Sequence, residues 1–232
     1  MTRNLISSFI SRAATISLVL LMLPTGPATA QGRKKVAPAK ADTVAFFRGV
    51  AVSGDLVGLA QKAFGSYGQY EAALRINLKD KYFPVFELGY GKADAEDATT
   101  NMSYKTSAPY GRVGIDFNLA KNKHDDYRLY GGFRYALTYY KFSVSGTGVT
   151  DPVWGEEVPF DVKDMSCNYH WLEGVFGVDA KLFGPIRLGW SLRYRRRLMH
   201  DDGTAGNTWY VPGFGKQGGT RLGGTFNVIF EL

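Results

Sequence analysis

The feature that most constrains this chain is an alternation of apolar and polar side chains that returns in segment after segment. In residues 69–79 ("QYEAALRINLK"), Tyr70, Leu74 and Ile76 fall on one side of an extended backbone, and Glu71 and Arg75 fall on the other. Successive side chains of a β-strand point to opposite faces, which gives this period of two. No helical period of comparable strength follows the first thirty residues, so the pattern predicts an all-β fold.

Eight segments carry the alternation, and their spacing predicts how they connect. They cover residues 48–58, 69–79, 83–91, 110–119, 127–140, 169–182, 186–198 and 222–232. The connections after the second, fourth and sixth segments are short, whereas those after the third, fifth and seventh cover residues 92–108, 141–168 and 199–218. Short turns at one end and long loops at the other are typical of an eight-stranded antiparallel up-and-down transmembrane β-barrel. Both ends of the barrel chain are then expected at the short-turn end.

Residues 1–43 have a different composition from the rest of the chain. Arg3 and Arg12 accompany an apolar run over residues 13–23, and "ATA" precedes Gln31, which is the order of a cleaved secretory signal peptide. The apolar run is shorter than the ~20 residues that a spanning helix needs. We therefore expect a signal peptide over residues 1–30, a flexible periplasmic leader over residues 31–43 and an outer-membrane barrel over residues 44–232.

The charge balance would suggest a nucleic-acid partner only in a cytosolic protein. The chain has 28 Lys+Arg and 21 Asp+Glu, a net charge of +7, and removal of Arg3 and Arg12 leaves 26 − 21 = +5. An exported chain does not meet nucleic acid, so we expect none as a partner. Cys167 is the single cysteine and has no second cysteine with which to form an internal disulfide.

Side-chain size decides which face of such a barrel points inward. A soluble, ligand-binding barrel would turn its apolar row inward, and a membrane barrel reverses this. The apolar row carries the bulky side chains Tyr70, Leu74, Phe86, Tyr90, Phe117, Phe133, Tyr139, Phe176, Trp190, Tyr194, Phe226 and Phe230. The opposite row carries glycines between charges: Gly89, Gly91, Gly114, Gly132, Gly177, Gly189 and Gly223.

An eight-stranded barrel has an interior only just wide enough for packed side chains, so the row with the glycines is predicted to face the lumen. The bulky row is then predicted to face lipid. Aromatic side chains near the strand ends are expected to form the interfacial girdles of a membrane barrel. These are Tyr110, Tyr139, Tyr140, Tyr169 and Trp171.

The same alternation predicts which charges line the lumen, because they share the row of the glycines; this row has inward parity, and the bulky apolar row has outward parity. These charges are Glu71, Arg75, Glu87, Arg112, Asp116, Arg128, Arg134, Glu173, Asp179, Lys181, Arg187, Arg193, Arg195, Arg221 and Glu231. Buried charges persist when they are paired, so the two signs are expected to neutralise each other in a packed lumen. A narrow conducting path is the alternative.

Several segments resemble the small outer-membrane β-barrel proteins of Gram-negative bacteria. They are "QYEAALRINLKDKYFPVFELGYGKA", "RLYGGFRYAL", "NYHWLEGVFGVDAK", "WYVPGFGK" and "TRLGGTFNVIFEL". More narrowly, the chain is similar to an uncharacterised family of such barrels, defined only as a domain of unknown function. The last segment also resembles the C-terminal strand that the barrel-assembly machinery reads, although its final residue is Leu232 and its aromatic residue is Phe230. The resemblance implies a fold and a location, and it implies no activity.

Three segments carry residue types that can do chemistry or bind. Ser166, His170 and Glu173 are the residue types of a lipid-deacylating triad, but His170 has outward parity and Glu173 inward parity, so they are expected to diverge. His200 beside Asp201 and Asp202 is compatible with a weak metal or phosphate site, or with a hydrated loop. Residues 209–219 ("WYVPGFGKQGG") either dock a partner or a lipid head group or fold onto the barrel rim.

These observations favour an outer-membrane barrel with a structural or interaction role, without catalytic residues, cofactor or metal. The expected partners are outer-membrane lipid, the barrel-assembly machinery during insertion, and an unidentified partner of the loops. The alternatives are a lipid-A or phospholipid-modifying barrel enzyme, or a narrow pore. Fold alone does not decide among them.

Overall fold

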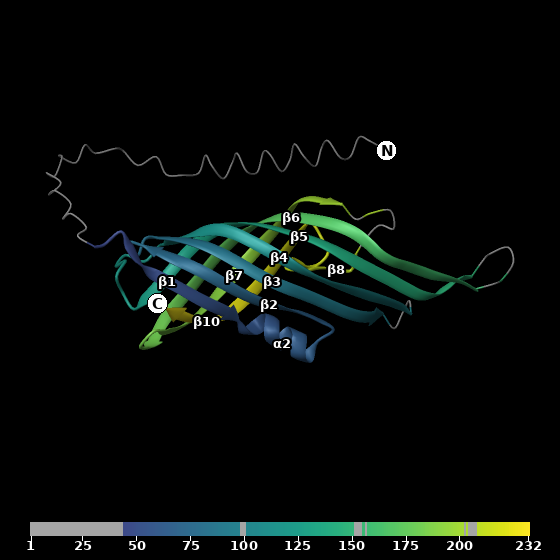
Figure 1. The fold of residues 1–232 in the computed structure, drawn as a ribbon, viewed down its shortest axis with the longest axis horizontal. Helices are drawn as coiled ribbons and strands as arrows, with labels where there is room; N and C mark the ends of the chain where they lie inside the picture. Colours follow the sequence, from purple (N-terminus) through teal and green to yellow (C-terminus); the bar gives the residue numbers. More distant parts are fainter. Residues whose placement is uncertain (1–43, 98–100, 151–154, 156, 202, 204–207) are drawn as a thin grey trace, which may run out of the picture. The chain divides into compact units, whose positions relative to one another are not determined.

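Eight strands of the described residues close into an antiparallel barrel (Figure 1). They are β1 (Phe47–Asp55), β2 (Tyr67–Leu78), β3 (Tyr82–Asp97), β4 (Met102–Asn118), β5 (Tyr127–Thr150), β6 (Glu157–Phe183), β7 (Ile186–Asp201) and β10 (Thr220–Glu231). Their order around the ring is β1-β10-β7-β6-β5-β4-β3-β2, so each strand pairs with its chain neighbour and β10 closes on β1. The predicted eight-stranded up-and-down barrel fold is confirmed.

The computed structural model describes residues 44–97, 101–150, 155, 157–201, 203 and 208–232. The predicted signal peptide and leader, residues 1–43, lie outside the described residues. The barrel's first strand begins and its last strand ends on the side of the short turns. There Val50 and Leu232 exchange backbone hydrogen bonds of 3.2 and 2.7 Å. This is the end that the alternation of loop lengths predicts.

One helix interrupts the strands, and the prediction missed it. α2 (Leu56–Phe64) begins immediately after β1, where Asp55 caps it by accepting hydrogen bonds from the backbone N–H groups of Val57 and Gly58. The first strand was expected to reach residue 58 and ends instead at Asp55. Apolar residues of α2 recur at helical spacing, but over only nine residues, which is too short for the period to stand out. No helix of the described part of the chain is long and apolar enough to cross a membrane.

Two of the three expected long loops are largely strand, which corrects the prediction. The β3–β4 hairpin pairs as far as Asp97↔Met102, and the β5–β6 hairpin as far as Thr150↔Glu157. Polar residues such as Asp94, Glu96 and Lys105 occupy the β3–β4 extension, and this composition hides its alternation. The third connection, between β7 and β10, contains the small sheet of β8 (Tyr210–Val211) and β9 (Gly215–Lys216).

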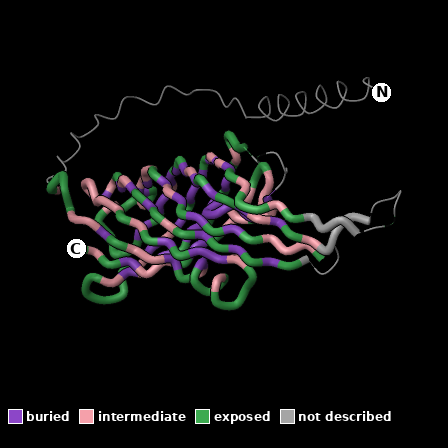
Figure 2. The backbone as a smooth tube through the Cα atoms, turned by 45° about the vertical axis from the view of Figure 1, so that its right-hand side comes forward, coloured by how far each residue is buried: buried purple, intermediate pink, exposed green. Residues whose placement is uncertain are grey.

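Buried and exposed residues alternate along the barrel strands (Figure 2). The bulky apolar side chains are the exposed ones. Phe133, Trp190 and Phe176 are 69%, 55% and 49% exposed, whereas charged side chains of the opposite row, such as Asp116 and Glu173, are buried. The charges therefore lie inside the barrel and the large apolar groups outside it, as side-chain size predicts.

The predicted aromatic girdle is wrong for four of its five residues. Tyr110, Tyr140, Tyr169 and Trp171 are buried inside the barrel, and only Tyr139 faces outward, at 64% exposed. Inward glycines make the room for such rings. Tyr110 lies directly opposite Gly89 on β3, where a Cβ would lie 2.2 Å from the tyrosine Cζ. The interior therefore holds a layer of aromatic rings as well as charges.

Candidate functional site

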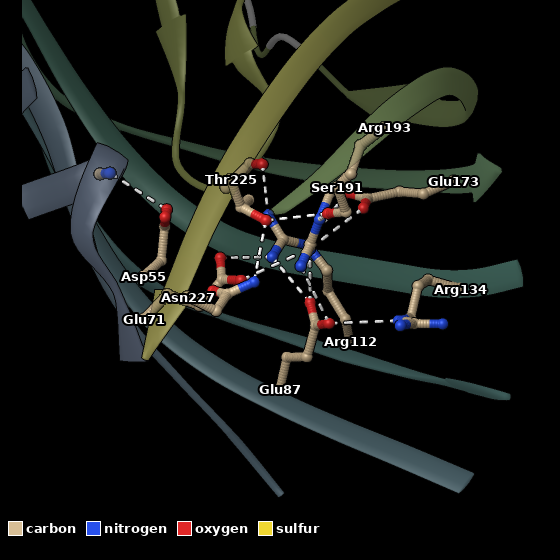
Figure 3. Close-up of polar contacts among 12 residues, drawn as sticks. Asp55, Glu71, Glu87, Arg112, Arg134, Glu173, Ser191, Arg193, Thr225 and Asn227 are labelled. Carbon is tan, nitrogen blue, oxygen red and sulfur yellow. Dashed lines mark hydrogen bonds and ion pairs between the residues drawn. The ribbon is translucent and has the colours of Figure 1, made fainter. Parts of the chain in front are cut away.

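Glu87 on β3 is the centre of a buried charge cluster in the lumen (Figure 3). Its carboxylate accepts hydrogen bonds from Arg193 Nη1 at 2.7 Å and Nη2 at 3.2 Å, from Arg112 Nη1 at 3.0 Å and from Arg134 Nε at 3.1 Å. These arginines come from β7, β4 and β5, so one carboxylate joins four strands of the barrel. Strand alternation places all four side chains inward at nearly the same depth.

Two more carboxylates complete the cluster on the side of the long loops. Arg112 contacts Glu71 Oε2 at 2.5 Å through Nη1 and Glu173 Oε1 at 3.0 Å through Nε, and Arg195 Nε lies 3.2 Å from the same Glu173 oxygen. Each of these acids also accepts a hydrogen bond from an aromatic side chain. Tyr110 donates to Glu71 at 2.6 Å, and Trp171 Nε1 donates to Glu173 at 2.7 Å. Three carboxylates thus face four arginines, Arg112, Arg134, Arg193 and Arg195.

Arg134 connects this cluster to a second one nearer the short turns. Its guanidinium binds Asp116 with both terminal nitrogens, at 2.7 and 2.9 Å. Arg75 Nη1 lies 2.8 Å from Asp179, and Arg187 Nε lies 2.7 Å from the other oxygen of that carboxylate. Arginine is suited to these contacts because its planar donors match a carboxylate. Ion pairs therefore continue along the lumen without a break between the two clusters.

The network ends at the short turns. Glu231 of β10 pairs with Arg128 and Arg187, and Asp80 of the β2–β3 turn accepts from Asn77 at 2.7 Å and contacts His124 Nδ1 at 2.7 Å and Arg48 Nε at 3.4 Å. Burial alone would raise the pKa of the Asp80 carboxyl. The hydrogen bonds to His124 and Asn77 and the charges of Arg48 and Arg128 outweigh burial and hold that pKa below its ordinary value.

The structure places the predicted lumen charges as follows. Buried members are Glu71, Glu87, Arg112, Asp116, Arg128, Arg134, Glu173, Asp179, Arg187, Arg193 and Arg195. Arg75 and Glu231 are partly buried and paired. Two placements differ from the prediction: Lys181 is exposed near the β6–β7 turn, and Arg221 donates to the backbone oxygen of Lys216. Both have inward parity, but both lie close to strand ends, where the wall no longer encloses them.

The β8–β9 segment folds into the mouth of the barrel at the long-loop end. Val211 and Phe214 are fully buried there, and the Phe214 ring packs against Tyr169 and Trp171 with ring centroids 4.9 and 5.8 Å apart. The backbone oxygens of Gly213 and Phe214 accept hydrogen bonds of 2.8 and 2.9 Å from Arg112 and Arg195. The segment therefore acts as a plug, and the rim-folding interpretation of residues 209–219 describes it better than an open docking loop.

Little space remains inside the barrel below the plug. A cavity of about 20 Å³ lies beside Glu87 and Arg193, and one of about 90 Å³ lies at the short-turn end beside Arg128 and Glu231. The first volume holds about one water molecule. Among the described residues, ion pairs and aromatic rings fill the path between the two ends.

The residues of the candidate triad lie on opposite sides of the wall. The His170 Nδ1 atom lies 2.7 Å from the Tyr135 hydroxyl, and this pair is exposed on the outer face. Glu173 is fully inside and bound to arginines. In the described part of the chain, no group of three His, Cys, Asp or Glu side chains is placed to hold a metal ion.

The inward aromatic rings and the plug are the parts of the site that sequence reasoning missed. The strand register contains a signal for the inward position of the rings. In two pairs, Tyr110↔Gly89 and Tyr130↔Gly177, an inward tyrosine lies directly opposite an inward glycine. A Cβ on Gly91 would lie 2.8 Å from Cα of Pro212 in the plug, so this glycine admits the plug itself. Glycines of the inner row therefore mark where large groups enter the lumen.

Comparisons with known proteins give one family and several similar barrels. The model of the family "Domain of unknown function (DUF6048)" matches residues 10–231. No curated protein sequence matches this chain. Similar solved structures include Neisserial surface protein A (NspA), with 12% identity over 81% of this chain and 98% of that one and a TM-score of 0.41.

Two further solved structures are similar at the same level. A major outer membrane protein from Thermus thermophilus has 14% identity over 79% of this chain and 98% of its own, with a TM-score of 0.41. Ail, the attachment invasion locus protein of Yersinia pestis, has 9% identity over 79% of this chain and 93% of its own, with a TM-score of 0.38.

Proposed function

This chain belongs to the family described as Domain of unknown function (DUF6048), and we propose that it is an outer-membrane β-barrel with a sealed lumen and a structural or interaction role. The observation that carries the proposal is the distribution of side chains across the barrel wall. Ion-paired arginines and carboxylates fill the interior, and large apolar side chains cover the exterior.

An exterior of this kind requires an apolar solvent. Large apolar side chains are exposed on strands around the ring, such as Phe86, Leu88 and Trp190, and so much exposed apolar surface would cause association in water. The helix continues this surface, because Leu56, Leu59 and Phe64 of α2 are exposed on its outer side. A lipid bilayer supplies an apolar solvent for both surfaces. The predicted signal peptide over residues 1–30 supports export to a Gram-negative outer membrane.

A sealed lumen favours a structural or interaction role over a pore. The plug closes the mouth, and paired charges occupy the space below it. The separation of His170 from Glu173 across the wall favours the same role over a lipid-modifying enzyme. We infer that outer-membrane lipid surrounds the barrel and that the assembly machinery inserts it through β10. The polar β3–β4 and β5–β6 hairpins are the surface offered to an unidentified partner.

The location is tested by fractionating cells that express the full chain and comparing heated with unheated samples of each fraction by gel mobility. Closed membrane barrels keep their structure in detergent until they are boiled. We expect the protein in the outer-membrane fraction with a mobility that changes on heating. A protein recovered in the soluble periplasmic fraction would overturn the proposal, and its apolar surface would then need another explanation.

A further inference from the structure

A helix replaces a strand at one place in the barrel wall. β1 pairs with β10 only from Ala51↔Glu231 to Asp55↔Asn227, and the chain then leaves the wall as α2. The part of β10 nearer the long loops, residues 220–226, pairs with β7 on one side and lies beside α2 on the other. Figure 1 shows α2 next to β2 and β10. The wall is therefore helical at this point, beside the outer apolar surface.

A polar cavity of about 200 Å³ lies behind the helix. Residues of α2, β2, β7, β10 and the plug line it, among them the cations Arg195, Lys216 and Arg221 and the carboxylate of Asp55 at the end of β1. Arg195 is buried and Lys216 is exposed, so the cavity runs from the interior to the surface. A Cβ on Gly215 would lie 4.0 Å from Arg195 Nη1 and 3.9 Å from Arg221 Cγ, so both arginine side chains pass close to Gly215 of the plug.

Two of the three cations of this cavity, Lys216 and Arg221, have no carboxylate within ion-pair distance among the described residues. The Lys216 ammonium lies instead over the rings of Trp209 and Tyr67, 5.1 and 5.9 Å from their centroids. Arg221 donates to the Lys216 backbone oxygen at 2.6 Å. These contacts hold two cations in place and leave their charge uncompensated.

One acid, Asp55, lines the cavity, and a second, Glu173, lies beside Arg195, but both are already engaged by other groups. Asp55 accepts backbone hydrogen bonds from Val57, Gly58 and Phe226, and Glu173 binds Arg112 as well as Arg195. The Arg195 Nε atom lies 3.2 Å from a Glu173 oxygen, and its Nη1 atom donates a hydrogen bond to the Phe214 backbone oxygen of the plug. Its remaining terminal nitrogen, Nη2, would lie 3.5 Å from a Cβ on Gly223, so the absence of a side chain there leaves this donor uncovered.

We propose that the cavity between α2, β10 and the plug binds a phosphoryl group. Two arginines and a lysine supply charge-assisted donors of the kind that phosphate oxygens accept. Tyr210 also lines the cavity, and burial raises the pKa of its hydroxyl to about 12. The volume admits a phosphate together with the first atoms of the molecule that carries it.

The phosphoryl group has two possible sources, a phosphorylated lipid head group that enters beside α2 or free phosphate from outside. The lipid source rests on the proposed membrane location, whereas the anion site itself does not. The test uses the full chain folded in neutral detergent micelles at fixed ionic strength. Calorimetry measures binding of inorganic phosphate in one arm and of phosphatidic acid added to the micelles in the other.

Three proteins are compared: the wild type, the double variant Lys216→Gln/Arg221→Gln and the matched control Arg196→Gln. Arg196 is exposed beside Arg195 on the outer face, so its loss removes a charge close to the cavity without changing the cavity. We expect the double variant to bind at least about tenfold more weakly than the wild type and the control to bind equally well.

The two arms separate the sources. Binding of phosphatidic acid alone identifies the lipid head group, and binding of inorganic phosphate in addition shows that the free anion suffices. The proposal is overturned if the wild type binds neither probe, or if the double variant binds as tightly as the Arg196→Gln control. A heat-dependent mobility shift in the same samples shows that the barrel is closed, so a failure here is distinct from a failure of the proposed membrane location.

Discussion

At the scale of single residues, Glu87 is the side chain on which most of the lumen depends. It accepts hydrogen bonds from Arg112, Arg134 and Arg193, and each of these guanidinium groups is buried. Removing one partner of a buried ion pair leaves an uncompensated charge, which costs about 3–5 kcal/mol. We expect Glu87→Gln to lower the free energy of unfolding by that amount, measured by urea titration in phospholipid vesicles.

The matched control for this substitution is Glu96→Gln, in the exposed extension of the same strand. Surface substitutions usually change stability by less than about 0.5 kcal/mol. If the two variants lose the same stability, the central cluster does not hold the barrel together, and the interpretation of the lumen as a packed core fails.

Asp80 makes the stability of the short-turn end depend on pH. Its pKa is lower in the folded chain than in the unfolded chain, so its contribution is present above the unfolded value of about 3.9 and declines as the pH falls towards the folded value. We expect Asp80→Asn to be less stable than the wild type at pH 7 and the difference to shrink below about pH 4. Unfolding curves from pH 7 to pH 3 measure it, with exposed Asp125→Asn as control. A difference that stays constant or grows on acidification would contradict this account.

The sequence predicts much of the site at this scale and misses a defined part of it. Strand parity alone places Glu87, Arg112 and Arg193 inside the barrel. It does not give the pairing, because Glu87 and Arg193 are 106 positions apart and meet only across the closed ring. Strand alternation also places Tyr169 and Trp171 on the inner row. The prediction places them in an interfacial girdle instead, because membrane barrels commonly carry aromatic residues at the interfaces.

At the scale of elements, the plug is the part of the structure most sensitive to one side chain. Phe214 anchors the plug between Tyr169 and Trp171, and the same buried cluster contains Cys167. Phe→Ala in a packed site costs about 3–5 kcal/mol, and here the loss is expected to loosen the plug before the barrel.

We expect Phe214→Ala to raise the rate at which a maleimide labels Cys167 by on the order of tenfold, because local opening becomes more frequent. The reaction is followed by mass spectrometry of the folded protein. Phe64→Ala is the control, since Phe64 is 92% exposed at the end of α2. Equal labelling rates in the two variants would show that Phe214 does not keep the mouth closed.

Elements differ in how far their sequence reveals them. The membrane-level strands are recognisable because one face is apolar and the other polar. The extension of the β3–β4 hairpin carries polar residues such as Asp94 and Lys105, so its alternation is weak and the sequence predicts a loop there. The helix α2 is hidden by its length, although Asp55 is a good N-cap residue and marks its start.

At the scale of the whole molecule, a closed lumen predicts an electrically silent protein. Ion pairs and the plug leave about 20 Å³ of free space beside Glu87 and Arg193, too little for a hydrated ion path. We expect no unitary conductance when the refolded full chain is added to a planar bilayer. Sustained channel openings that change when Arg193 is replaced by Glu would identify a pore and overturn the sealed-barrel account.

The central claim is that the apolar face of the barrel contacts lipid and the charged face does not. Tryptophan fluorescence in vesicles whose acyl chains carry bromine tests it most directly, because bromine quenches only nearby indoles. Trp190 is 55% exposed on the outer wall, whereas Trp171 is buried in the lumen. We predict strong quenching of the wild type and loss of most of that quenching in Trp190→Phe. Quenching that is absent from the wild type, or unchanged by Trp190→Phe, would contradict the inside-out arrangement.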